Sequence, residues 1–188
     1  MRFGPVAVLE AAEEEAREQE VDDDAESREL ALSLTDELDA TAYVLAEARR
    51  GVVARSEADA VVRILAAQLD RHDLPQAAST EDPGVYPQFH AVNTALLSMA
   101  VGTSAGIDHA GRHRLGLAAL LHDIGMTQLP EELSGRESLS DQDRALVESH
   151  TARGAKFLIE VGGRSLDLAA AVAFEHHLRP DGNGYPVR

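Results

Sequence analysis

Apolar residues recur at intervals of three and four in one segment after another of this chain, which is the spacing of a helix with one buried face. The clearest stripe consists of Val92, Ala95, Leu96, Met99 and Ala100. No segment alternates apolar and polar residues as a half-buried strand would. The sequence therefore predicts an all-α protein.

The stripes and their flanking residues predict the extent of each helix. Ser56 with Asp59 resembles a capping box at a helix start, and Ser140 with Asp143 resembles another. Glycines and prolines mark the ends, because neither continues a helix without cost. The expected helices cover residues 27–50, 56–69, 92–100, 115–122, 140–162 and 166–177.

The chain divides into four parts by composition. Residues 10–29 hold eleven acidic and two basic residues, out of a net charge of −16 for the whole chain, so residues 1–26 are expected to form a disordered or frayed tail. Residues 27–75 form an N-terminal helical extension that packs or dimerises, and a homodimer is one possible assembly. The stretch 74–88 contains three prolines and a glycine and lacks helical periodicity, so residues 76–88 are expected to form a linker, which leaves 89–188 as the domain that carries the chemistry.

Composition excludes several classes of protein. Cysteine is absent, so any metal must be held by His nitrogens and carboxylate oxygens, which favours Fe, Mn or Zn, or Mg and Ca if carboxylates dominate. The acidic charge argues against binding a nucleic acid polymer, although bound cations could still admit an anionic phosphodiester. No segment approaches the roughly 18 apolar residues of a membrane span, and a cytoplasmic location is expected.

Histidines stand on the inward stripes of three successive expected helices, at His122, His150 and the pair His176-His177. A single histidine in such a position is usually a core residue that bonds to a backbone carbonyl. Several neutral imidazoles buried together leave hydrogen-bonding capacity unmet, whereas a metal ion uses their lone pairs. The set therefore predicts a metal site.

Asp123 follows His122 directly, so one helix end supplies both a nitrogen and a carboxylate that can bridge two cations. Two metals roughly 3.5–4 Å apart can share an activated hydroxide and bind the oxygens of a phosphoryl group during in-line displacement. Phosphate ester hydrolysis then needs no nucleophilic Ser or Cys. His122 and Asp123 are the predicted catalytic residues of a metallo-hydrolase.

The ordered motifs resemble the HD-GYP subgroup of the HD phosphohydrolase superfamily. They are the run His122-Asp123-Ile124-Gly125, the later His150, and His176-His177 followed by residues 181–186, which read Asp-Gly-Asn-Gly-Tyr-Pro. The stretch from His90 to Asp123 also resembles the run into that family's metal motif. The resemblance covers roughly Tyr86 to Arg188.

The resemblance implies an HD-domain helical bundle with two or three metal ions, usually iron or manganese. Such domains hydrolyse the bacterial second messenger cyclic di-GMP to the linear dinucleotide pGpG or to GMP. The implied metal ligands are His90, His122, Asp123, His150, His176 and His177.

The resemblance also implies a role for the loop after the paired histidines. Its candidate substrate-binding residues are Asp181, Gly182, Gly184, Tyr185 and Pro186. The two glycines would let the backbone turn, and the tyrosine could stack on a guanine. The same loop is a candidate contact surface for diguanylate cyclase domains.

Four features depart from the family's pattern. Met126 stands where a lysine is usual, Leu178 where a glutamate is common, and Tyr86 where members with three metals carry a glutamate, so two metals are expected here. The family continues for several helices beyond the position of Arg188, including a metal-ligating aspartate, so the domain is expected to be incomplete at its C-terminus. Two alternatives stay open: a catalytically silent regulatory module, and a metal hydrolase for a different nucleotide.

Overall fold

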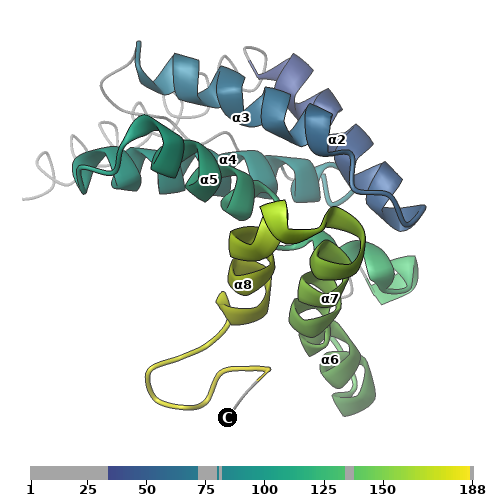
Figure 1. The fold of residues 1–188 in the computed structure, drawn as a ribbon. Helices are drawn as coiled ribbons and strands as arrows, with labels where there is room; N and C mark the ends of the chain where they lie inside the picture. The colour runs from purple at the N-terminus through teal and green to yellow at the C-terminus, as the bar shows by residue number, and fades with distance from the viewer. Residues whose placement is uncertain (1–33, 72–79, 81, 134–137, 187–188) are drawn as a thin grey trace, which may run out of the picture.

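The computed structural model describes residues 34–71, 80, 82–133 and 138–186 (Figure 1). The acidic tail at 1–26 and the start of the first expected helix lie outside these ranges. Within them every regular element is helical, which confirms the all-α prediction for the described part of the chain. The α-helices are α2 (Thr35–Arg49), α3 (Arg55–Leu69), α4 (Tyr86–Ser104), α5 (His109–Leu120), α6 (Asp141–Glu148), α7 (His150–Gly162) and α8 (Asp167–Glu175), and the short 3-10 helices are η1 (Ile124–Gln128), η2 (Glu131–Leu133) and η3 (Arg164–Leu166).

The helices are stacked in pairs, with α5 in the middle (Figure 1). The pair α2 and α3 lies against the pair α4 and α5, and α7 packs against α8 on the other side. Helix α5 contacts α3, α4 and α8, while η1, which follows α5, contacts both α2 and α7. The segment that joins α5 to η1 therefore lies where the two halves of the molecule meet.

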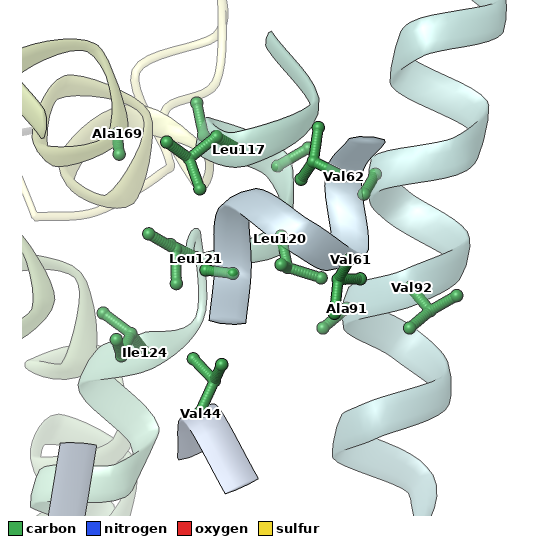
Figure 2. Packing of buried hydrophobic residues seen from close by; sticks show 14 of the residues in the cluster. Val44, Val61, Val62, Ala91, Val92, Leu117, Leu120, Leu121, Ile124 and Ala169 are labelled. Carbon is green, nitrogen blue, oxygen red and sulfur yellow. The ribbon is translucent and has the colours of Figure 1, made fainter. Parts of the chain in front are cut away.

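One hydrophobic cluster runs through all of these layers. Figure 2 shows Leu120 and Leu121 at the end of α5 among side chains from the N-terminal helices and from η1. Val44 of α2 and Val61 of α3 are each 1% exposed within this cluster. The N-terminal helices thus share their core with the helices that carry the histidines.

The two expected helix starts turned out differently. Ser140 is the N-cap of α6 and accepts a hydrogen bond from the Asp143 backbone N–H at 3.1 Å, as predicted. The prediction of a capping box at Ser56 is wrong, because α3 already begins at Arg55 and its N-cap is Ala54. Ser56 donates instead to the Glu57 carboxylate, so its hydroxyl does not cap the helix.

Several helix boundaries also differ from the sequence prediction, and α5, for example, covers His109–Leu120 where 115–122 was expected. Helix α4 begins at Tyr86, inside the expected linker, because Pro87 in a first helical turn has no hydrogen bond to lose. The expected helix over 140–162 is divided at Ser149, whose hydroxyl donates to the Leu146 carbonyl at 2.6 Å. The division makes His150 the first residue of α7.

No helix in the described ranges is both long enough and apolar enough to cross a membrane.

Replacing Leu65, which is fully buried in α3, tests whether the N-terminal helices belong to the common core. We expect Leu65→Ala to lower the free energy of unfolding by about 2–5 kcal/mol, because it leaves a cavity. Urea unfolding, followed by circular dichroism and by hydrogen exchange in α7 and α8, should show one shared transition moving to lower urea. Ile64→Ala, at a position 44% exposed on the same helix, is the control and should shift it little. Unchanged protection in α7 and α8 would contradict a common core.

Candidate metal centre

The Asp123 carboxylate lies between two pairs of histidines, one pair beside each oxygen. Its Oδ2 lies 3.5 Å from His90 Nε2 and 3.4 Å from His122 Nε2. Its Oδ1 lies 3.1 Å from His150 Nε2 and 3.2 Å from His176 Nε2. One carboxylate is thus shared by two sets of imidazoles.

Residues far apart in the chain build this cluster. His90 comes from the start of α4, His122 and Asp123 from the turn after α5, and His150 from the start of α7. His176 and His177 directly follow α8. The structure groups potential ligand atoms within 4.8 Å of one another in two sets that share the carboxylate: His90, His122, Asp123; and Asp123, His150, His176, His177. All six predicted ligands therefore meet, and we call them the candidate centre.

Backbone carbonyls fix the orientation of three of these rings. His122 Nδ1 lies 2.7 Å from the Ala119 carbonyl oxygen, and His150 Nδ1 lies 2.7 Å from that of Val147. His176 Nδ1 lies 3.0 Å from the Ala173 carbonyl oxygen. A carbonyl only accepts, so each Nδ1 carries the proton and donates it, and each Nε2 is turned toward the carboxylate.

This arrangement fits a bound cation. His150 Nε2 and His176 Nε2 lie 3.1 Å apart, and in the neutral rings both carry lone pairs because both Nδ1 atoms are donors. His90 Nε2 and His122 Nε2 are also 3.1 Å apart. Lone pairs that face one another repel unless a proton or a metal ion lies between them. Converging imidazole nitrogens and carboxylate oxygens are a usual ligand set for a divalent metal.

Electrostatics around the carboxylate favour positive charge at its side. Burial alone would raise the pKa of Asp123, but its interactions with His122, His150 and His176 outweigh burial and hold the pKa far below its usual range. Burial opposes charging of His122 as well, yet its hydrogen bond and attraction to Asp123 leave the pKa of that histidine raised. The carboxylate stays ionised and needs a cation beside it, either an imidazolium or a metal ion.

The outer histidines are biased toward the neutral form. Burial, followed by repulsion from His176 and His150, lowers the pKa of His177 to about 4. Burial and then His122 lower the pKa of His90. A neutral imidazole keeps a lone pair for a metal ion.

Two glycines let η1 approach α7 closely enough to bring Asp123 to His150. A Cβ atom on Gly125 would lie 1.9 Å from the His150 carbonyl oxygen and 2.6 Å from the Gly154 backbone nitrogen. A Cβ on Gly154 would lie 3.0 Å from the Gly125 nitrogen. Backbone meets backbone here, so there is no side chain that can move aside.

The loop after α8 folds back over the candidate centre. The Tyr185 ring stacks on the His177 ring, with centroids 4.6 Å apart and planes at 30°, and its backbone N–H donates to the His177 carbonyl at 3.2 Å. A Cβ on Gly184 would lie 2.3 Å from that same carbonyl oxygen, so the close approach needs glycine. Burial, then the charges of Glu148 and Asp123, raise the pKa of Tyr185. Its ring contacts a histidine, and stacking on a guanine stays a prediction.

The other predicted loop residues lie outside the cluster of histidines. Asp181 is exposed, accepts from the Asn183 backbone N–H at 3.0 Å and pairs with Arg179 Nη2 at 3.2 Å. Gly182 has φ of 73°, a left-handed conformation that suits glycine. Pro186 is half-buried at the end of the loop.

Sequence reasoning missed a cavity of about 600 Å³ beside the candidate centre. Helix α2 supplies part of its wall, at Ala42 and Leu45, which look like core positions in the helical stripe. Tyr86 also lines it and stacks on His90, with centroids 5.6 Å apart and planes at 12°. No signal in the sequence separates the positions that line this cavity from those that fill the core.

The His-Asp pair and the helical fold around it define the class of protein. The sequence model of the HD domain matches residues 62–188, and the chain belongs to the HD domain family. The match begins within α3, ahead of the predicted start of the chemistry-bearing domain at residue 89.

The chain is also similar to curated bacterial phosphodiesterases. It is 33% identical over 102 residues to a cyclic di-GMP phosphodiesterase of Pseudomonas aeruginosa, which covers 54% of this chain and 24% of that one. It is 30% identical over 98 residues to a cyclic di-GMP phosphodiesterase of Thermotoga maritima, covering 52% and 27%. It is 27% identical over 100 residues to 3'3'-cGAMP-specific phosphodiesterase 2 of Vibrio cholerae, covering 53% and 19%. The chain thus matches only about a quarter or less of the length of these relatives, and no solved structure matches it.

The close approach at Gly125 gives a prediction for metal binding. We expect Gly125→Ala to push η1 away from α7 and separate Asp123 from His150, so that bound Mn²⁺ falls while the helical content changes little. Equilibrium dialysis with elemental analysis, together with circular dichroism, measures both. Gly102→Ala is the control, because its Cβ would meet mainly the flexible end of Leu115 and should leave metal content unchanged. Full metal content in Gly125→Ala would contradict the proposed packing constraint.

The Tyr185 ring gives a second prediction. We expect Tyr185→Phe to keep the stacking on His177 and to bind Mn²⁺ as the unchanged chain does, whereas Tyr185→Ala should weaken binding by a factor of about 3 to 10, the value of one aromatic contact. Competition with a fluorescent chelator reports the affinity. Equal affinities for both variants would show that the stacking does not hold His177 in place.

Proposed function

We propose that this chain is a metal-dependent phosphodiesterase of the HD-GYP type that hydrolyses cyclic di-GMP. The observation that carries the proposal is the Asp123 carboxylate, shared between His90 and His122 on one oxygen and His150 and His176 on the other. The relatives are phosphodiesterases of cyclic dinucleotides, which supports the substrate class. The Gly-Tyr-Pro loop against His177 supports the HD-GYP assignment.

Two sets of ligands would each hold one divalent metal ion. One ion would be held by His90, His122 and Asp123, and the other by Asp123, His150, His176 and His177. Imidazole and carboxylate ligands without thiolate suit iron and manganese, the metals that the family resemblance implies. When bound, such ions acidify a water molecule and neutralise phosphoryl oxygens.

The chain's own residues would orient the reaction. The carbonyls of Ala119 and Val147 hold the rings of His122 and His150 so that their Nε2 atoms stay aimed at the carboxylate. His122 and His150 are almost completely buried, whereas His90 and Asp123 are partly exposed. A substrate phosphate would therefore approach Asp123 from the side of His90.

A catalytically silent regulatory module is the second candidate. Met126 lines the cavity at the position where the HD-GYP resemblance expects a lysine, so a cation for the substrate phosphate is lacking there. Such a module would keep the fold and a bound metal ion and would not turn over cyclic di-GMP.

The deciding experiment measures hydrolysis of cyclic di-GMP by the chain purified without oxygen and loaded with Mn²⁺ or Fe²⁺. We expect metal-dependent formation of pGpG or GMP, and an activity at least about 100-fold lower in Asp123→Asn. The reason is that mutating even a residue that hydrogen-bonds a metal ligand typically lowers metal affinity or activity about 10- to 100-fold. Asp167→Asn, an exposed aspartate at the start of α8, should retain the activity. A parallel assay with 3'3'-cGAMP identifies the preferred dinucleotide.

Three outcomes separate the candidates. Full turnover in Asp123→Asn would exclude the shared carboxylate as the basis of catalysis. Bound metal without turnover of either dinucleotide would favour the silent module. Hydrolysis of another phosphodiester alone would keep the metal hydrolase and change its substrate.

A further inference from the structure

The cavity beside the candidate centre lies on the exposed side of that centre. His90 and Asp123 both line it, and their side chains are 38% and 34% exposed. The side chains of His122 and His150, behind them, are only 7% and 2% exposed. A molecule that fills this cavity therefore touches the open face of the shared carboxylate.

The size and the walls of the cavity suit part of a nucleotide. Its volume of about 600 Å³ lies within the usual range for small-molecule sites, roughly 300–1,000 Å³. Leu45, Leu120 and Met126 give it an apolar wall, and Tyr86 presents an aromatic ring at its edge. A planar base would find both apolar contact and a stacking surface here.

Arg49, at the end of α2, is the single Lys or Arg side chain among the described residues that line this cavity. Its Nη1 pairs with Glu131 Oε1 at 2.9 Å, and the two side chains are 43% and 77% exposed. An exposed pair of this kind contributes little to stability, so its partner can be exchanged. The backbone beside it is fixed, because Gln128 Nε2 of η1 donates to the Ala48 carbonyl at 3.0 Å.

Two carboxylates also line the cavity, those of Asp123 and Asp82. Asp82 Oδ1 accepts a hydrogen bond from the Gly84 backbone N–H at 2.8 Å, and the ion pair of Arg49 is with Glu131. The chain as a whole carries a net charge of −16, so a local cation is needed to attract an anionic ligand. Guanidinium is well suited to this role, since it binds phosphate oxygens in a bidentate manner.

We propose that Arg49 is a substrate-binding residue that pairs with the second phosphate of a cyclic dinucleotide, while the first phosphate lies at Asp123 and one base occupies the cavity. The inference rests on the proposed function for the substrate class. It assigns a binding role to α2, which holds none of the candidate metal ligands. When the substrate enters the cavity, Arg49 leaves its ion pair with Glu131 and binds the phosphate.

The test compares a substrate with two phosphates and one with a single phosphate. We expect Arg49→Gln to raise KM for cyclic di-GMP about tenfold or more, the value of one charge-assisted hydrogen bond, with kcat little changed. The KM for bis(p-nitrophenyl) phosphate, which has no second phosphate, should stay within about twofold. Arg49→Lys should recover part of the loss.

Two control variants separate ligand binding from a structural role of the arginine. Glu131→Gln removes the partner of Arg49 and should leave KM unchanged or lower it, because the guanidinium is then free for the phosphate. Arg50→Gln removes a neighbouring charge that pairs with Glu47 at 2.6 Å and does not line the cavity. It should leave both substrates unaffected.

The outcomes keep this inference distinct from the proposed function. An unchanged KM for cyclic di-GMP in Arg49→Gln, or an equal rise in Glu131→Gln, would overturn the binding role. If the unchanged chain hydrolyses neither substrate, the proposed function fails, and the inference is then tested by fluorescence anisotropy with a fluorescently labelled cyclic di-GMP and the Mn²⁺-loaded chain. Weaker binding in Arg49→Gln alone would support the inference, and equal binding in all variants, or none in the unchanged chain, would overturn it.

Discussion

The ionised carboxylate of Asp123, held among four imidazoles, is the interaction around which this molecule is organised. A partly buried negative charge costs free energy unless positive charge lies beside it. Here four histidine Nε2 atoms point at the two carboxylate oxygens of Asp123. Those nitrogens cannot all keep unshared lone pairs at such distances without repulsion. The site is therefore balanced only when protons or metal ions occupy it, which makes cation binding a consequence of the packing.

That packing depends on helices from both halves of the chain. The turn between α5 and η1 carries His122 and Asp123, and it is held by the core on one side and by α7 on the other. Gly125 and Gly154 allow the backbones of η1 and α7 to touch, so a change as small as one methyl group at this contact would alter the geometry of the site. The positions of the histidines are set by helices that the hydrophobic core holds together.

The two sides of the candidate centre differ. On the side of His177 the loop after α8 closes over the cluster through the ring of Tyr185. On the side of His90 the cluster opens into a cavity that α2 also lines, through residues that include Arg49. The candidate centre is thus closed at His122 and His150, which are buried, and accessible at His90 and Asp123, which line the cavity.

The helical class and the approximate positions of most helices could be predicted from the sequence, because a stripe of apolar residues marks a buried face. A histidine on such a stripe points inward, which singled out His122, His150 and the pair His176-His177. The complete set of six candidate ligands, with His90, was implied by the resemblance to the HD-GYP subgroup. The errors came where neighbouring side chains compete. The Ser56 hydroxyl donates a hydrogen bond to the Glu57 carboxylate and does not cap α3. The expected helix over 140–162 is divided at Ser149.

Local patterns in the sequence are enough to predict the helices and to mark His122, Asp123, His150 and the pair His176-His177 as potential metal ligands. Three features of the site come from tertiary packing: Asp123 divides its two oxygens between two pairs of histidines, Tyr185 stacks on His177, and α2 lines a cavity beside His90. These features depend on the angles and separations between helices that are distant in the chain. Such distances arise from the packing of the whole core, and no local pattern of residues records them.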